Sequence, residues 1–208
     1  MTSFLLQLLT FLKTGHLQLF LIFFLLVQLF WWARVFIASK NKRYTKPFKG
    51  TIAVIVAVLR EDPELFEKSL KSIKRFGKPS EFIISIDDYT HADAAIKKIA
   101  KKYGTQVLEQ RELLGKREQY ALCTAAIKSD VDVIVTVDSD TIWDKTTTSI
   151  LKPFNDPTVG AASGRQTIFN ASDNYIRRIA EWFEDLRFSV SLPFQSYFGQ
   201  VKDRKSVV

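Results

Sequence analysis

The stretch Val131–Val137, which reads Val-Asp-Val-Ile-Val-Thr-Val, runs directly into Asp138-Ser139-Asp140 and decides the fold of this 208-residue chain. The run is short, apolar and rich in β-branched residues, which is typical of a buried parallel strand. Ligands of open α/β sheets bind at the carboxyl ends of such strands. Side chains at positions i and i+2 of an extended segment point the same way, so Asp138 and Asp140 can reach one hard cation. We therefore expect Mg²⁺ or Mn²⁺ there, held jointly with the phosphates of a nucleoside diphosphate.

A plainer interpretation of the same tripeptide remains open at this point. Asp138 would cap a following helix, and Asp140 would simply face solvent. A D-x-D tripeptide is common, so the rest of the chain has to decide between the two interpretations.

A long apolar segment, residues 17–38, precedes the α/β pattern. About 20 apolar residues at a rise of about 1.5 Å each cover the hydrocarbon core of a bilayer. Trp31 and Trp32 fit the interfacial aromatic belt, and Arg34 can reach the interface from the helix end. We predict a retained transmembrane helix. The alternative is a cleaved signal peptide, whose apolar core would be shorter and followed by small residues.

The flanks of this segment predict its orientation. The juxtamembrane linker, residues 39–49, carries five basic residues, whereas only Lys13 and the amino terminus precede the helix. The positive-inside rule then predicts a single-pass membrane protein whose later residues lie in the cytoplasm, with the linker against anionic lipid headgroups. Residues 1–16 contain an apolar stretch too short to span, which is either interfacial or a remnant of a second span.

Composition excludes several classes of function. The net charge is +8, but basic and acidic residues alternate through the later part of the chain and no nucleic-acid-binding module is recognisable, so we expect no nucleic-acid partner. A single cysteine, Cys123, precludes an intramolecular disulfide and is consistent with a reducing compartment. Two distant histidines make a structural zinc site implausible.

From Gly50 onward, strands and helices alternate. Strands are expected at 51–59, 82–86, 105–108 and 131–137, and helices at 63–76, 91–103 and 116–128. Asp62 and Pro63 mark a helix start, and Gly77 and Gly104 mark helix ends. Strands that alternate with helices of about a dozen residues imply a parallel sheet with right-handed crossovers, hence an α/β nucleotide-binding architecture.

Charged residues follow three of these strands, at Arg60-Glu61, Asp87-Asp88 and Asp138-Ser139-Asp140. In a parallel sheet these ends share one edge, so five carboxylates would crowd one crevice and need a cation or a nucleobase donor. Asp87 or Asp88 could accept the N–H of uracil; the alternative is a turn before the next helix. Gly115-Lys116-Arg117 opens a helix and can form an anion site, unless it is only a solvated helix end.

Four segments together resemble family 2 glycosyltransferases of the GT-A fold, and among them the membrane polysaccharide synthases, most closely the hyaluronan synthases, with chitin and cellulose synthases also similar. They are residues 55–64, Gly115-Lys116-Arg117-Glu118, Val137-Asp138-Ser139-Asp140-Thr141 and Asp156-Pro157-Thr158-Val159-Gly160; residues 195–199 add a late match. The resemblance implies a Rossmann-like nucleotide-diphospho-sugar transferase domain at residues 50–200. It also implies a UDP-sugar donor (UDP-GlcNAc or UDP-GlcA) and a growing polysaccharide as acceptor.

The resemblance also implies roles for individual residues. Asp138 and Asp140 would bind Mg²⁺ or Mn²⁺ on the donor diphosphate. The donor pocket would contain Glu61, Asp87 or Asp88, Lys116 and Arg117. The segment 173–194 looks like the amphipathic helix that lies along the membrane in that family, although it could equally be an ordinary helix packed on the sheet.

The match departs from the family at Leu59, where an aromatic residue is usual, and at Arg165, where an aspartate is usual. The family continues beyond the last match into an acceptor segment, a general base, a Q-x-x-R-W motif and further transmembrane helices. We therefore expect a C-terminally truncated chain with an incomplete domain, no identifiable catalytic base, and a tail at 201–208.

The leading hypothesis is a membrane-anchored sugar transferase, inactive if the missing base is essential. The first alternative is a non-catalytic, membrane-tethered UDP-sugar-binding or regulatory fragment, which could pair with a full-length synthase. The second is a remnant without a stable fold.

Overall fold

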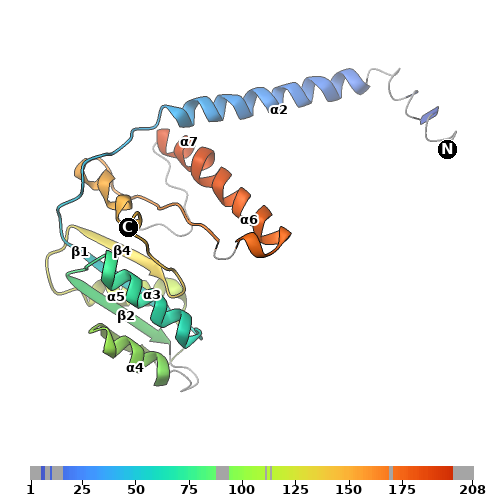
Figure 1. The fold of residues 1–208 in the computed structure, drawn as a ribbon. Helices are drawn as coiled ribbons and strands as arrows, with labels where there is room; N and C mark the ends of the chain where they lie inside the picture. Colours follow the sequence, from blue (N-terminus) through green and yellow to red (C-terminus); the bar gives the residue numbers. More distant parts are fainter. Residues whose placement is uncertain are drawn as a thin grey trace. The chain divides into compact units, whose positions relative to one another are not determined.

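A computed structural model describes residues 6–7, 10, 16–87, 94–110, 112, 114–168 and 171–198. These residues fall into two compact units, one formed by residues 44–164 and the other by residues up to 43 together with residues from 165 onward. The units are described separately below, and Figure 1 shows the elements of each.

The first unit is an α/β layer structure with a four-stranded parallel sheet of order β3-β2-β1-β4. The strands and helices alternate along the chain as the sequence predicts (Figure 1). In chain order they are β1 (Ile52–Val58), α3 (Pro63–Phe76), β2 (Glu81–Asp87), α4 (Ala94–Lys102), β3 (Gln106–Gln110), α5 (Lys116–Ala125), β4 (Val133–Asp138) and the 3-10 helix η1 (Thr147–Asn155).

Local signals set the helix ends of this unit. The Asp62 carboxylate accepts from Leu65 N at 2.8 Å, and Pro63 occupies the first helical position, so α3 starts as predicted. Gly104 follows α4 in the left-handed conformation, at φ +67°, because only glycine adopts it without strain. The predicted start of α4, residues 91–93, lies outside the described residues. Helix α5 ends at Ala125, three residues before the predicted Lys128.

The two faces of the sheet bury different side chains. Even-numbered residues of β1, such as Val54 and Val56, pack with α3 and α4 in the larger core. Odd-numbered Ile55 packs with Ile83 and with Cys123 of α5 in a smaller core. Burial raises the pKa of the Cys123 thiol to about 12, so this cysteine is an inert core residue, as its apolar surroundings predict.

Strand β4 pairs with β1 in parallel, as predicted, but it is an edge strand of the sheet formed by the described residues. Its side chains alternate between buried and half-buried, whereas every side chain of the central strand β1 is buried. The expectation of burial on both faces was therefore wrong for β4. The apolar run reflects its β-branched content rather than a central position in the sheet.

The second unit consists of helices. Helix α2 (His16–Ser39) contains one segment, Leu17–Ser39, long and apolar enough to cross a membrane, and none of its most apolar stretch is buried within the protein. Helix α6 (Tyr175–Leu186) begins at its cap Asn174 and continues through a π-helical turn, η3 (Arg187–Ser191), into α7 (Leu192–Tyr197). Large apolar side chains of α6, among them Tyr175, Ile176 and Trp182, are exposed, as an amphipathic helix requires.

Helix α2 packs on η3 and α7 around Arg34. The guanidinium donates to Ser191 Oγ at 2.9 Å and lies 5.3 Å from the ring centroid of Phe194. The rings of Phe30 and Trp31 lie 5.8 and 5.5 Å from the same guanidinium. The one cation of this apolar helix is thus engaged by protein groups of its own unit.

Candidate functional site: the carboxyl edge of the sheet

The carboxyl edge of the sheet gathers side chains from β1, β2, β4 and the start of α5. Helix α5 runs between parallel strands, so it lies antiparallel to them and its first residues lie at their carboxyl ends. In the ladder, Ala57 pairs with Ser85 on one side and with Asp138 on the other. Ser85, Ala57 and Asp138 therefore form one row across three strands, on the face that α5 covers.

Asp138 ends β4, and its carboxylate is held by two side chains of α5. Lys116 Nζ forms an ion pair with Asp138 Oδ1, and Tyr120 Oη donates toward Val137 O at 3.3 Å and Asp138 Oδ1 at 3.4 Å. The two α5 residues are four positions apart and so lie on one helix face. Burial, and then the Asp138 charge, raise the pKa of Tyr120, so its hydroxyl stays protonated and acts as a donor.

Asp140 lies in a turn rather than on an extended strand end. Thr141 N donates to Asp138 O at 3.1 Å, which closes the turn immediately after β4. The side chain of Asp140 is exposed, and that of Asp138 is one-fifth exposed. The extended i, i+2 geometry expected from the sequence was therefore wrong. No helix starts directly after Asp138, so the capping alternative for this residue does not apply either.

The turn is tied to two other elements. Ser139 is buried and donates to Glu61 Oε1 at 2.6 Å, which joins the end of β4 to the end of β1. The residues after Asp140 are held by α3. Ser69 Oγ donates to Thr141 O at 2.7 Å, and Trp143 N donates to Ser72 Oγ at 2.8 Å. The residues on both sides of Asp140 are thus fixed, while its own carboxylate faces solvent.

Asp87, the last residue of β2, is buried at this edge. Its Oδ2 accepts from Leu114 N at 3.1 Å, in the segment that leads into α5, while Oδ1 accepts no hydrogen bond from any described residue. Asp88 lies outside the described residues. The structure brings Glu61 to Ser139, Lys116 to Asp138, and Asp87 to the start of α5.

The remaining basic residues of the edge are exposed. Arg117 of α5 faces solvent. Arg60, just after β1, has φ +52°, a left-handed conformation that costs a non-glycine residue of order 1–2 kcal/mol. Such strain often accompanies functional loops. Among the described residues, no group of three or more His, Cys, Asp or Glu side chains forms a metal cluster.

Sequence reasoning missed two residues of this edge, Gln119 and Tyr120. Gln119 is 2% exposed, and its Nε2 donates to Leu114 O at 3.5 Å. The helical spacing of the sequence could have revealed that Gln119 is buried. Gln119 lies four positions before the apolar Cys123 and so shares its helix face, which is buried against the sheet.

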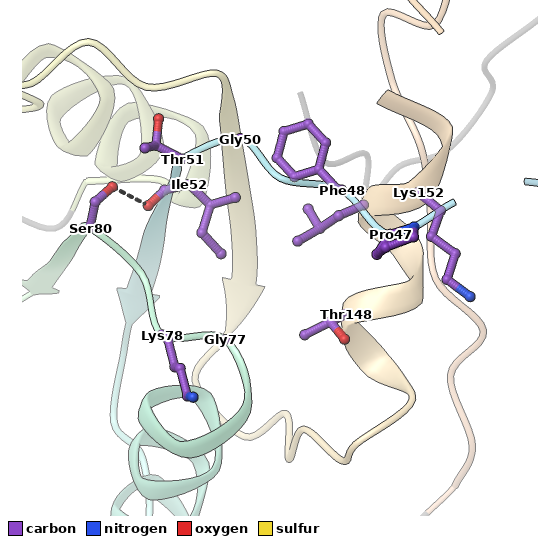
Figure 2. A pocket seen from close by; sticks show the side chains of 11 residues that line it. Pro47, Phe48, Gly50, Thr51, Ile52, Gly77, Lys78, Ser80, Thr148 and Lys152 are labelled. Carbon is purple, nitrogen blue, oxygen red and sulfur yellow. Dashed lines mark hydrogen bonds between the residues drawn. The ribbon is translucent and has the colours of Figure 1, made fainter. Parts of the chain in front are cut away.

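A cavity of about 360 Å³ lies elsewhere in this unit. Figure 2 shows it at the start of β1, between Ile52, Lys78 and the η1 residues Thr148 and Lys152, with Ser80 Oγ donating to Ile52 O at 2.8 Å. This is the amino edge of the sheet, opposite the carboxylates. We therefore do not assign it to the candidate site.

Comparison with known proteins gives consistent results. The family model described as glycosyl transferase family 2 matches residues 53–205. The hyaluronan synthase of Streptococcus pyogenes serotype M3 is 32% identical over an alignment of 168 residues, and the match covers 75% of this chain and 40% of that protein. Hyaluronan synthase 3 of Xenopus laevis is 26% identical over an alignment of 192 residues, and the match covers 74% of this chain and 34% of that protein. The chain thus spans about two-fifths or less of these relatives.

Among solved structures, the mannosyltransferase PcManGT of Pyrobaculum calidifontis, in complex with GDP-Man and Mn²⁺, superposes with a TM-score of 0.54 at 24% identity. The superposition covers 72% of this chain and 45% of that one. It supports the fold alone: a GT-A glycosyltransferase fold with a parallel four-stranded sheet. The family model covers well over half of the chain, and its match contains Lys116, Asp138 and Asp140. The chain therefore belongs to glycosyl transferase family 2.

Proposed function

We propose that the carboxyl edge of the sheet binds a UDP-sugar together with Mg²⁺ or Mn²⁺, and that the protein serves polysaccharide synthesis of the hyaluronan synthase type. The observation that carries the proposal is the Asp138 carboxylate at the end of β4. It forms an ion pair with Lys116 and is followed by the exposed Asp140. A carboxylate, a second carboxylate and a cation at one strand end suit a metal diphosphate.

The spacing of the strands supports a nucleotide of this size. Strands β2 and β4 flank β1, and Asp87 lies two residues beyond Ser85, the residue level with Asp138, so the backbones of Asp87 and Asp138 are about 12 Å apart. A diphosphate at Asp138 leaves room for a nucleoside directed toward β2. There Asp87 Oδ1, or the neighbouring Asp88, would accept the uracil N–H.

The residues present fit a hard divalent cation. Asp138 and Asp140 would supply carboxylate oxygens, and the diphosphate would supply further oxygen ligands. The cation would stabilise the charge that develops on the departing UDP. Lys116 would then turn from Asp138 to the diphosphate, and Arg117 and Glu61 would line the donor pocket. The site would hold the donor by charge at one end and by the base at the other.

The membrane part of the proposal rests on α2 and on the basic linker at residues 39–49. The apolar helix would span the bilayer once, with the α/β unit on the cytoplasmic side. The exposed apolar side chains of α6 would lie in the membrane interface. The similarity to hyaluronan synthases supports a polysaccharide as acceptor, and we propose UDP-GlcNAc or UDP-GlcA as the donor from the family resemblance of the sequence.

The first experiment is calorimetric titration of UDP into detergent-purified protein, with and without Mn²⁺. We expect Mn²⁺-dependent binding that falls by about tenfold or more in Asp140→Ala, because a charged ligand of the metal is lost. The matched control is Asp130→Ala, an exposed aspartate before β4 at the amino edge of the sheet, which should bind like the wild type. Folded protein that fails to bind UDP in Mn²⁺ would overturn the donor site.

Transfer is measured separately, in membranes supplied with both UDP-sugars. Incorporation of labelled sugar into a hyaluronidase-sensitive polymer is the expected result. Binding without incorporation would refute transfer by this chain while leaving the donor site intact. Protease protection of the α/β unit in inside-out against right-side-out vesicles tests the cytoplasmic orientation.

A further inference from the structure

Two consecutive side chains of α5, Gln119 and Tyr120, are not used in the proposed function, yet each contacts the surroundings of one site carboxylate. We propose that they are positioning residues with separate tasks: Gln119 aligns Asp87 for the nucleobase, and Tyr120 aligns Asp138 for the metal. The inference rests on the proposed donor site and assigns its two ends to one helix.

Gln119 acts on Asp87 through a peptide group. Its Nε2 donates to Leu114 O at 3.5 Å, and Leu114 N donates to Asp87 Oδ2 at 3.1 Å. The carboxamide therefore anchors the carbonyl of the same residue whose N–H orients the carboxylate. With Oδ2 occupied by this peptide, Oδ1 is the acceptor that remains for a base.

The surroundings of Asp87 contain buried polar atoms that lack partners. Asp87 Oδ1, Gln119 Oε1 and Ser85 Oγ are all inaccessible to solvent, and none has a hydrogen-bond partner among the described residues. Ser85 and Asp87 lie two positions apart on β2 and so share the face covered by α5. Buried acceptors without donors are costly in a stable fold, and a ligand that donates an N–H removes part of that cost.

Tyr120 acts on Asp138 directly. Its ring packs against the smaller core of Ile55, Ile83 and Cys123, which fixes the position of its hydroxyl. That hydroxyl donates toward Asp138 Oδ1 at 3.4 Å, and Lys116 Nζ lies 5.7 Å from the ring centroid. When Lys116 leaves Asp138 for a bound diphosphate, the tyrosine keeps the carboxylate oriented.

The two tasks are separable because consecutive helix residues point about 100° apart. Gln119 is directed toward the segment before α5, and Tyr120 toward β4. Removing one side chain should therefore weaken one end of the site and leave the other unchanged.

The test compares two probes by calorimetry in Mn²⁺, UDP and inorganic pyrophosphate, which lacks the base. We expect Gln119→Leu to weaken UDP binding about tenfold and to leave pyrophosphate binding unchanged, since only base alignment is lost. We expect Tyr120→Phe to weaken both probes about fivefold, since the defect is at the metal.

Matched controls remove the same groups at the opposite edge. Gln106→Leu alters the first residue of β3, and Tyr103→Phe removes a hydroxyl that donates to Glu67 Oε1 at 3.2 Å. Both should bind UDP and pyrophosphate like the wild type. Circular dichroism and thermal midpoints identify any variant that has lost its fold.

A ligand-side measurement keeps the test decisive if Gln119→Leu is unstable. N3-methyl-UDP lacks the base N–H, so the wild type should bind it more weakly than UDP. Gln119→Glu, which keeps the shape of the side chain, should discriminate less between the two ligands.

The inference is refuted if Gln119→Leu weakens both probes equally, if Tyr120→Phe leaves metal-dependent binding intact, or if the wild type binds N3-methyl-UDP and UDP alike. The proposed function itself fails in a different way, namely when folded wild-type protein binds neither UDP nor pyrophosphate in Mn²⁺.

Discussion

At the scale of single residues, two fully buried serines of the α/β unit, Ser69 in α3 and Ser85 in β2, differ in whether the hydroxyl has a partner. Ser69 Oγ donates to Thr141 O at 2.7 Å, whereas Ser85 Oγ has no partner among the described residues. We expect Ser69→Ala to lower the free energy of unfolding by about 1–2 kcal/mol, because the Thr141 carbonyl loses its donor. Ser85→Ala should be neutral or stabilising by up to about 1 kcal/mol.

Urea unfolding of the detergent-purified protein, followed by circular dichroism, measures both changes, and each variant is the other's control. Equal losses of stability would contradict the assignment, because both substitutions remove the same atom from an equally buried position. A selective loss in Ser69→Ala should also loosen the turn at Asp140 and weaken Mn²⁺-dependent UDP binding.

At the scale of elements, Arg34 links α2 to η3 and α7 through its hydrogen bond to Ser191 Oγ. We expect Arg34→Leu to raise the rate of tryptic cleavage after Arg187 about tenfold, since a charged hydrogen bond that opposes local opening is lost. Arg34→Lys should be intermediate, because lysine keeps the charge without the planar guanidinium that stacks on Phe194.

The matched variant is Ser191→Ala, which removes the acceptor and leaves the charge. It should reproduce a large part of the Arg34→Leu effect. Cleavage rates in both variants that equal the wild-type rate would show that the contact does not hold the helices together.

At the scale of the whole molecule, acid should destabilise the α/β unit through carboxylates that accept hydrogen bonds in the folded state. Hydrogen bonds from Thr51 lower the pKa of Asp132, and those from Ser129 lower the pKa of Glu81. Hydrogen bonds from Thr146 and Thr147 do the same for the pKa of Asp144. A lowered folded-state pKa adds stability above the unfolded-state value, which is lost as pH falls through the folded-state pKa.

Thermal midpoints measured between pH 7 and pH 3 should therefore be constant near neutral pH. They should decrease once the pH falls below about 4.5, the usual range of carboxyl pKa values. Asp132→Asn retains an acceptor for Thr51 N but cannot titrate, so its acid slope should be shallower than that of the wild type. An identical slope would exclude Asp132 as a contributor.

The parts of the fold that could be predicted are those with local signals. The ends of α3 followed from Asp62, Pro63 and Gly77, because caps act on the nearest turn. The edge position of β4 could not be predicted, because strand order depends on pairings far apart in the chain. The turn at Asp140 was missed for a related reason: its shape is set by Ser69 and Ser72 of a different element.

The same division holds for the candidate site. The shared edge of Asp87, Lys116 and Asp138 follows from the direction of parallel strands and crossover helices, which the sequence pattern indicates. The roles proposed for Gln119 and Tyr120 depend on which way a helix face is turned over the sheet. That rotation is fixed by the packing of Cys123 against Ile55 and Ile83 of the sheet, and it cannot be read from the spacing of the motifs.

The position of Trp143 makes it an intrinsic fluorescent reporter of the candidate site. Of the four tryptophans, Trp31, Trp32 and Trp182 belong to the helical unit, and only Trp143 lies in the α/β unit. It is 3% exposed, follows Asp140 by three residues and packs against Gly77. Its fluorescence should be blue-shifted and resistant to aqueous quenchers. If the helical unit lies in a bilayer, as we propose, the exposed rings of Trp32 and Trp182 should be quenched by brominated lipid, and Trp143 should not. Quenching by brominated lipid can thus separate an event at the aspartate turn from an event at the bilayer.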